Sequence, residues 1–246
     1  MSEARGAGPF ESASIPDAYR RLLQPVMFEP WAVRLIDYIG LSAGQPVLDV
    51  ASGTGAVARA AATRVGAEGH VIASDISAAM LAQVTTGLDP RGSPVQTLGS
   101  PATDLALPDS SVDVVLCQQG FPFIADRLGA AREMRRVLRP GGRLGVAVWL
   151  SGRRLEPFET YAEVLAAEGV GEPYPHANDS ERFKMSEQDV DRTLADGGFQ
   201  DVSLSTEDMV LAWPSVDAAA LAITGTPFGP VLGCAREGNG TMTLRV

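Results

Sequence analysis

The stretch VLDVASGTGAVARAA (residues 47–61) joins an apolar run, a glycine-containing turn and an alanine-rich segment. The apolar run predicts a buried strand, and the alanine-rich segment predicts a helix that begins just after the turn. Glycines at 53 and 55 let the backbone approach a ligand closely, and the first turn of the helix offers free N–H groups. The stretch therefore predicts a cofactor-binding loop at the end of a strand in an α/β domain.

The loop fits two cofactor patterns. Gly53, Gly55 and Ala58 match G-x-G-x-x-A, the pattern of loops that bind nicotinamide dinucleotides. Asp49, Ala51, Gly53 and Gly55 nearly match D-x-G-x-G-x-G, the pattern of loops that bind S-adenosylmethionine. Either cofactor brings an anionic group that suits a helix N-terminus. The glycines alone therefore do not choose between hydride transfer and methyl transfer.

Asp49 favours S-adenosylmethionine. It lies inside the apolar strand, where a dinucleotide loop has small apolar residues. A buried acid is unfavourable by several kcal/mol unless it meets a partner. The α-ammonium group of S-adenosylmethionine is such a partner, whereas the pyrophosphate of NAD would be repelled.

Asp75 ends the next apolar run, 20 residues after Gly55. A carboxylate at this position accepts hydrogen bonds from ribose hydroxyls, which both cofactors carry. Ile76 follows it and offers an apolar surface to adenine. Ser77 is placed to cap the next helix.

The rest of the first 150 residues alternates apolar runs with helical spacing. Strands are expected at 44–50, 69–76, 93–99, 110–119 and 143–150. Helices are expected at 55–65, 78–88 and 124–138, after two N-terminal helices that Pro25 and Pro30 interrupt. Strands that are apolar on both faces and alternate with helices predict a doubly wound, mostly parallel, Rossmann-like α/β sheet.

Composition excludes several classes. The net charge of −10 argues against a nucleic acid partner. Two cysteines and two histidines form no metal-ligand spacing, so no metal is expected. The first 16 residues lack an apolar signal-peptide core, and no run of 18 apolar residues predicts a membrane span. We expect a soluble, cytoplasmic protein.

Four segments in this order resemble class I S-adenosylmethionine-dependent methyltransferases, in the group that includes the ubiquinone and menaquinone biosynthesis enzymes. The similarity covers roughly residues 15–150. The segments are VLDVASGTG, ASDISAAML, LALPDSSVDVVLCQQGFPF and AAREMRRVLRPGGRLGVAVW. The resemblance implies methyl transfer from S-adenosylmethionine to a small-molecule acceptor, with S-adenosylhomocysteine as the product.

The resemblance also implies an organisation for the chain. Residues 1–13 are expected to be disordered, and residues 14–246 to form a single methyltransferase domain. Its cofactor-binding core would span 45–150, and the segments 14–40 and 151–190 would cover the substrate. The sheet would have seven strands and end in an antiparallel C-terminal pair. Expected C-terminal elements are helices at 157–169 and 186–196 and strands at 200–213 and 241–246.

The last strand is short and follows a glycine-rich stretch. A minimal last strand would leave a sheet edge open, and an open edge favours a homodimer.

By the same resemblance, particular residues would contact the cofactor. Asp49, Ala51, Ser52 and Gly53 would line its methionine end, and the main-chain carbonyl of Gln118 would face its amino group. Around the ribose and adenine the implied residues are Asp75, Ile76, Met80, Ala102 and Thr103, with Tyr19 and Phe28 as a cover.

Two positions depart from the family pattern. Ala51 replaces the first glycine, which is tolerable if its φ is negative. Pro101 replaces an aspartate that receives the adenine amino group, and proline has no side-chain acceptor. We therefore expect retained but weakened cofactor binding.

The acceptor side is less defined by the sequence. An apolar pocket is expected from Gln119, Phe123, Trp149 and Tyr161. His176, in the loop EPYPHAND, is the candidate general base, although a solvated loop histidine is the plainer interpretation.

Two alternatives remain open at this stage. One is a family member that binds the cofactor without methylating, such as a cyclase, an isomerase or a binding module. The other is a nicotinamide-dependent oxidoreductase.

Overall fold

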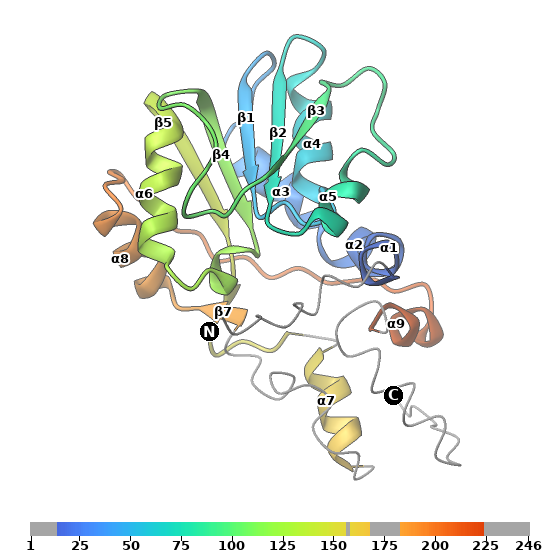
Figure 1. The fold of residues 1–246 in the computed structure, drawn as a ribbon. Helices are drawn as coiled ribbons and strands as arrows, with labels where there is room; N and C mark the ends of the chain where they lie inside the picture. The colour runs from blue at the N-terminus through green and yellow to red at the C-terminus, as the bar shows by residue number, and fades with distance from the viewer. Residues whose placement is uncertain (1–13, 156–157, 168–182, 224–246) are drawn as a thin grey trace, which may run out of the picture.

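A computed structural model describes residues 14–155, 158–167 and 183–223 of the chain. Its centre is a five-stranded sheet with the strand order β3-β2-β1-β4-β5, in which every neighbouring pair is parallel (Figure 1). The strands are β1 (Pro46–Val50), β2 (His70–Asp75), β3 (Val95–Gly99), β4 (Val112–Gln118) and β5 (Leu138–Ala147). The order changes direction at β1, so the loops after β1 and β4 diverge at the edge where ligands bind in such sheets.

Helices cover both faces of the sheet (Figure 1). On one face lie α3 (Glu29–Tyr38), α4 (Ala56–Val65) and α5 (Ala78–Val84). On the other face lie α6 (Arg127–Val137) and α8 (Glu187–Asp196). The expected doubly wound, Rossmann-like arrangement is confirmed.

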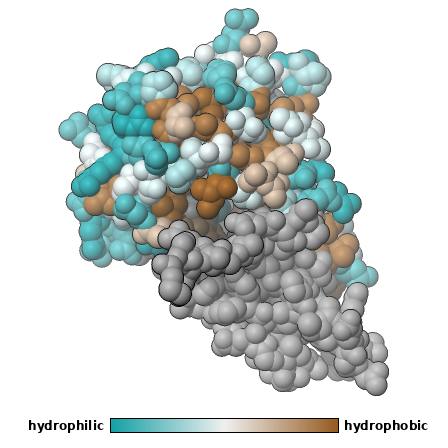
Figure 2. Space-filling model, in the orientation of Figure 1, coloured by the Kyte–Doolittle hydropathy of each residue, from teal (hydrophilic) through white to brown (hydrophobic). Residues whose placement is uncertain are grey.

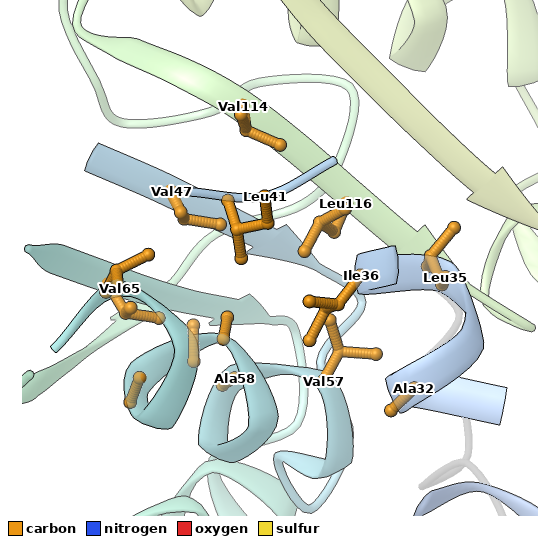
Figure 3. Packing of buried hydrophobic residues seen from close by; sticks show 14 of the residues in the cluster. Ala32, Leu35, Ile36, Leu41, Val47, Val57, Ala58, Val65, Val114 and Leu116 are labelled. Atoms are coloured by element: carbon orange, nitrogen blue, oxygen red, sulfur yellow. The ribbon is translucent and has the colours of Figure 1, made fainter. Parts of the chain in front are cut away.

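The core under α3 and α4 is built from small and branched side chains. Figure 3 shows strand residues such as Val47 and Leu116 directed at Ile36 and Val57 of the helices. Ala58 is completely buried in this cluster. A larger side chain at position 58 would separate α4 from the sheet, so Ala58 of the G-x-G-x-x-A match serves helix packing.

The N-terminal segment is nearly continuous helix. It comprises α1 (Ser14–Ala18), a π-helical turn η1 (Tyr19–Leu23), α2 (Gln24–Met27) and α3. Pro25 and Pro30 stand in the first turns of α2 and α3, where proline loses no helical hydrogen bond. These helices lie beside α5 and α9 (Val216–Ile223), near the carboxyl ends of the strands (Figure 1).

The predicted strand at 143–150 is divided. β5 ends at Ala147, and Trp149–Leu150 forms β6 in a separate parallel pair with β7 (Lys184–Met185). Lys184 is buried, and its Nζ lies 2.7 Å from Oε1 of Glu159 in α7 (Phe158–Ala167). This ion pair joins α7 to the small β6-β7 sheet.

Two expectations about the sheet are wrong for the described residues. The main sheet has five strands, not seven, and residues 200–213 contain no strand. Instead, that segment runs along α3, where the Tyr38 hydroxyl donates to the Ser203 carbonyl and Arg34 Nε donates to Glu207. The second predicted strand, 241–246, and the disordered segment 1–13 lie outside the described residues.

Helix capping follows the sequence closely. Ser77 accepts a hydrogen bond from the Met80 N–H at the start of α5, as predicted. Ser186 caps α8 in the same way, through the Asp189 N–H. A short 3-10 helix, η2 (Phe121–Phe123), follows β4.

Apolar surface is concentrated over the sheet. Figure 2 shows hydrophobic residues in the middle of the visible face, with hydrophilic residues around them. Within the described ranges, no helix is long and apolar enough to cross a membrane.

Candidate functional site

The loop after β1 alternates between ordinary and left-handed backbone. Ala51, Gly53 and Gly55 have φ values of 55°, 54° and 86°. The three glycine positions of D-x-G-x-G-x-G are therefore the three left-handed positions of the turn. The expectation of a negative φ at Ala51 is wrong, because alanine here adopts the backbone of the glycine that it replaces.

The loop after β4 meets the β1 loop. Gln119 is also left-handed, with a φ of 57°, and its N–H donates to the Ala147 carbonyl at 2.7 Å. The next residue, Gly120, lies against Ala51. Left-handed backbone at a non-glycine residue is unfavourable by about 1–2 kcal/mol. Ala51 and Gln119 are two such residues in loops that meet at one edge of the sheet, and they mark a place where the fold holds strain, as functional sites do.

Asp49 lies beneath this loop. The residue is 1% exposed, and its Oδ2 has no hydrogen-bond partner. Burial raises the pKa of this carboxyl well above its usual range, and the negative charge of Asp75 adds to the effect. The backbone of Ala58 and the charge of Arg59 only partly oppose it. Oδ2 of this acid thus has no donor of its own to stabilise the ionised form.

Asp75 lies at the end of β2, next to the same loop. Its Oδ2 accepts the Gly53 N–H at 2.9 Å, and its Oδ1 accepts the Ser77 N–H at 2.8 Å. A carboxylate has about four acceptor positions, so each oxygen can still receive another donor. Ile76 beside it is 79% exposed, which is unusual for a large apolar side chain and leaves a flat surface open.

The remaining expected adenine contacts differ in exposure. Met80, within α5, is buried, and Ala102 is partly buried. Pro101 and Thr103 are exposed. Thr103 therefore has its hydroxyl at the surface, where it is accessible to a ligand.

Tyr19 and Phe28 bring the N-terminal helices over the strand ends. Their rings are stacked with centroids 5.1 Å apart. Burial and the negative charge of Asp75 both raise the pKa of the Tyr19 hydroxyl, so Tyr19 lies near the end of β2. Nε2 of Gln118 donates to the Phe28 carbonyl at 2.9 Å. The expected cover is therefore attached to the ends of both β2 and β4.

Four buried polar atoms without partners gather at this edge. They are Asp49 Oδ2, Ser52 Oγ, Gln118 Oε1 and Gln119 Oε1, from the ends of β1 and β4 and the loops that follow them. The described residues contain only two others, Ser111 Oγ and Arg127 Nε. Because buried polar atoms are nearly always hydrogen-bonded, this concentration indicates that a polar ligand binds here.

The expected acceptor residues fall into two aromatic groups. Trp149 makes edge contacts with Phe28 and Trp31, at centroid distances of 6.4 and 6.2 Å. Phe123 is 56% exposed and stacks instead on Phe183, at 4.9 Å. Gln119 is buried at the end of β4. Tyr161 lies in α7. His176 lies outside the described residues.

Several contacts at this edge escaped the sequence analysis. Trp31 was assigned only to a helix, and Phe183 to a loop. Gln24 is fully buried and accepts a short hydrogen bond from the Thr54 hydroxyl. A polar residue within an apolar helix face was the available signal for Gln24. Its partner, 30 residues away, could not be read from the sequence.

Metal ligands are not grouped in the described ranges: no three His, Cys, Asp or Glu residues cluster there. His70 is the first residue of β2, at the edge of the sheet opposite to Asp75. It therefore lies away from the candidate site, as expected for a structural residue.

The sheet order, the left-handed loop and the acids at the ends of β1 and β2 define a Rossmann-like cofactor-binding domain. Residues 48–146 match the family model described as "Methyltransferase domain". The same region contains the loops and strand ends described above.

Curated relatives extend the match. The chain is 36% identical over 145 residues to the ubiquinone/menaquinone biosynthesis C-methyltransferase UbiE of Hahella chejuensis. The aligned region covers 58% of each protein. It is 31% identical over 189 residues to the enzyme of the same name from Yersinia pestis. That aligned region covers 71% of this chain and 74% of the Yersinia pestis enzyme. The chain belongs to the class I S-adenosylmethionine-dependent methyltransferases of the UbiE-like group.

Solved structures support the fold. A SAM dependent methyltransferase from Aquifex aeolicus has a TM-score of 0.56 and 24% identity, over 75% of this chain and 88% of that one. The YcgJ protein of Bacillus subtilis has a TM-score of 0.50 and 21% identity, over 68% of both chains. Family membership makes S-adenosylmethionine the cofactor and S-adenosylhomocysteine its product, which excludes the nicotinamide interpretation.

Proposed function

We propose that this methyltransferase transfers the methyl group to a small aromatic acceptor of the phenol or quinol type. The observation that carries the proposal is the group of four unpartnered polar atoms at and just after the ends of β1 and β4, where Gln118 also donates to the Phe28 carbonyl. The Phe28 ring makes an edge contact with Trp149, which in turn contacts Trp31. Polar atoms and aromatic rings at one strand edge suit a cofactor with a charged methionine end next to a flat, apolar acceptor. The names of the UbiE relatives, which refer to ubiquinone and menaquinone biosynthesis, agree with this acceptor class.

On the cofactor side, the chain offers groups that match S-adenosylmethionine. Asp49 would meet the α-ammonium group directly or through water, and Ser52 and Gly53 would line the methionine end. Asp75 would accept the ribose hydroxyls through the lone pairs that its two backbone contacts leave free. Ile76 and Met80 would enclose adenine, with Ala102 and Thr103 along its edge.

The chemistry requires alignment more than proton transfer. S-adenosylmethionine supplies an activated methyl group on a sulfonium, and the departing thioether is neutral. The residues of this chain would orient the acceptor and exclude water, and alignment of this kind lowers a barrier by several kcal/mol. Tyr19 and Phe28 would screen the site, and the carboxamide of Gln119 would orient a hydroxyl on the acceptor ring.

A general base is needed only for an acceptor that arrives protonated. We keep His176 as the candidate for that role. Replacing it with alanine while turnover of a quinol stays unchanged would assign it to the loop surface instead.

Cofactor binding is tested by calorimetry with S-adenosylhomocysteine. Asp75→Asn should weaken binding about tenfold, because a hydrogen bond from a ribose hydroxyl to a charged carboxylate contributes about 1.5 kcal/mol. Asp89→Asn is the matched control, because Asp89 Oδ1 accepts the N–H of Arg91, two residues later, as Asp75 Oδ1 accepts that of Ser77. Asp89 is not among the expected cofactor contacts. Equal affinities for the two variants would exclude Asp75 as a ribose ligand.

Methyl transfer is tested with labelled S-adenosylmethionine and a panel of quinols, phenols, amines and carboxylates. We expect label in the quinols and phenols, with a turnover that falls in Gln119→Ala. Transfer only to amines or carboxylates would overturn the acceptor class. Tight cofactor binding without transfer to any member of the panel would favour a non-methylating relative.

A further inference from the structure

A cavity lies between the N-terminal helices, α4 and the residues just after α5. Its volume is about 340 Å³. Arg20, Arg21 and Gln24 line one side of it, and Arg59 of α4 lines another. Thr86 and Gly87, just after α5, complete the wall. None of these residues is among the expected cofactor or acceptor contacts, although Gln24 and Arg59 both hydrogen-bond Thr54 of the cofactor loop.

The cavity wall is cationic in a strongly acidic protein. Three of its side chains are guanidinium groups, whereas Glu29 is its one carboxylate, and the whole chain has a net charge of −10. Asp17, which is not in the wall, offsets part of this charge through contacts of 3.4 Å with Arg20 and 2.9 Å with Arg21. A local positive region that survives in an acidic chain favours an anionic ligand.

Arg59 is the least compensated of these cations. Its side chain is 14% exposed, and its Nη2 lies 3.8 Å from Glu29, beyond hydrogen-bond distance. Glu29 instead accepts a 2.7 Å hydrogen bond from the neutral Gln24 amide. Burial lowers the pKa of the Arg59 guanidinium, and the nearby positive charge of Arg20 lowers it further, whereas the negative charges of Glu29 and Asp49 only partly oppose these effects. An anion between Arg20 and Arg59 would relieve both effects.

We propose that this cavity binds a phosphate-type oxyanion, either free or as part of a small phosphorylated metabolite. Guanidinium groups bind phosphate through paired, charge-assisted hydrogen bonds, and Arg20, Arg21 and Arg59 approach the cavity from two elements. The threonine hydroxyl at position 86 adds a neutral donor. The volume exceeds that of one phosphate, so the site has room for a diphosphate or a phosphate with a small organic group.

The cavity is connected to the cofactor loop. Arg59 Nη1 donates to the Thr54 carbonyl at 2.7 Å, and the Thr54 hydroxyl donates to Gln24. Thr54 stands between the left-handed residues Gly53 and Gly55. An anion that draws Arg59 or Gln24 toward the cavity would therefore shift the loop, and the affinity for the cofactor would change with it. This coupling rests on the assignment of the loop to the cofactor, whereas anion binding itself does not.

The test uses the full chain, titrated by calorimetry with pyrophosphate and with inorganic phosphate at constant ionic strength. The wild type should bind pyrophosphate, and the double variant Arg20→Gln/Arg21→Gln should bind it at least about tenfold more weakly. Arg34→Gln is the matched control, because Arg34 is an exposed helical arginine with its own carboxylate partner, Glu207. If the double variant fails to fold, Arg21→Gln alone serves, since that side chain is already 59% exposed.

The outcomes separate the proposal from the proposed function. Pyrophosphate binding that is lost in the double variant and kept in Arg34→Gln supports the site, and a stronger response to pyrophosphate than to phosphate supports a phosphorylated ligand. No binding by the wild type, or equal loss in both variants, overturns it. Coupling predicts that pyrophosphate changes the Kd of S-adenosylhomocysteine at least about twofold in the wild type and in Arg34→Gln, and not in the double variant. Anion binding in a protein that does not bind S-adenosylhomocysteine would refute the cofactor assignment and leave the anion site standing.

Discussion

Ala51 and Gly120 are in such close contact that a Cβ placed on Gly120 would lie 2.5 Å from the Cβ of Ala51. The two residues belong to the loops after β1 and β4, which, with the strand ends before them, carry the unpartnered polar atoms of the site. The family glycine at position 51 would leave this space open. The departure at Ala51 is therefore accommodated by the absence of a side chain at position 120.

Gly120→Ala should destabilise the protein by about 1–3 kcal/mol, because the new methyl group overlaps that of Ala51. The backbone of Gly120 has a φ of −87°, which alanine adopts freely, so the effect is steric. In the Ala51→Gly background the same substitution should be much less damaging. Denaturant unfolding of the four proteins gives the coupling, and additive effects would show that the two residues do not share this space.

Ala51→Gly should stabilise the protein by about 1 kcal/mol, because a φ of 55° is unfavourable for alanine and accessible to glycine. Ala61→Gly, in the middle of helix α4, is the contrasting control and should destabilise. Thermal unfolding of both variants checks the prediction. A lower melting temperature for Ala51→Gly would mean that packing against Gly120 outweighs the backbone strain.

Much of the fold could be predicted because parallel strands are buried on both faces. The three central strands, β1, β2 and β4, are buried along most of their length and appear in the sequence as apolar runs. The edge strands β3 and β5 are more exposed, and β5 begins five residues before the predicted 143–150. Caps at Ser77 and Ser186 were equally local signals. Segments whose structure depends on distant partners were less accessible.

Residues 200–213 illustrate that limit. Their composition suits a strand, yet Val210 is 95% exposed and the backbone forms no ladder. The segment binds side chains of α3 more than 160 residues earlier. Trp149 is a second case. The strand β5 ends two residues before it, and the Trp149 ring contacts Phe28 and Trp31 of the N-terminal helices. Neither set of partners leaves a periodic signal in the sequence.

The candidate site was predicted in part for the same reason. Asp49, Asp75 and the loop between Ala51 and Gly55 lie at strand ends, and their positions follow from the strands themselves. Ala51 was misjudged, because a backbone angle depends on the loop geometry and not on the residue type alone. The pairing of Phe123 with Phe183 requires the β6-β7 sheet to be known, because Phe183 directly precedes Lys184, the residue of β7 that pairs with Trp149.

Pro101→Asp should tighten the binding of S-adenosylhomocysteine about three- to tenfold. The exposed position lacks a side-chain acceptor, and one added hydrogen bond to the adenine amino group is worth about 0.5–1.5 kcal/mol. Pro101→Asn, which keeps an acceptor without the charge, should give a smaller gain. Calorimetry on the three proteins checks this, and unchanged affinity in both variants would place adenine elsewhere.

Asp49→Asn should stabilise the free protein and weaken cofactor binding. In the folded state the pKa of Asp49 lies well above its value of about 4 in the unfolded chain. Stability is therefore lost as the pH rises above 4, because the unfolded chain releases the proton first. The advantage of asparagine should grow between pH 5.5 and pH 8, to about 1–3 kcal/mol. The exposed Asp191→Asn is the control, and an advantage that is independent of pH would contradict the assignment.

Cys117 should behave as a buried, neutral thiol even in mild alkali. Burial, with a smaller effect from the charge of Asp49, raises its pKa to about 12. In the unfolded chain the thiol ionises near pH 8.5, so the folded state loses stability relative to the unfolded state as the pH rises from about 9 toward 12. In a Cys234→Ser background, the stability difference between Cys117 and Cys117→Ala should fall by about 1.4 kcal/mol per pH unit over that window. Urea unfolding at pH 8, 9.5 and 10.5 measures it, and thiol labelling at pH 8 should be no faster than unfolding. A constant difference, together with rapid labelling of the folded protein, would show that the thiol is accessible from the site.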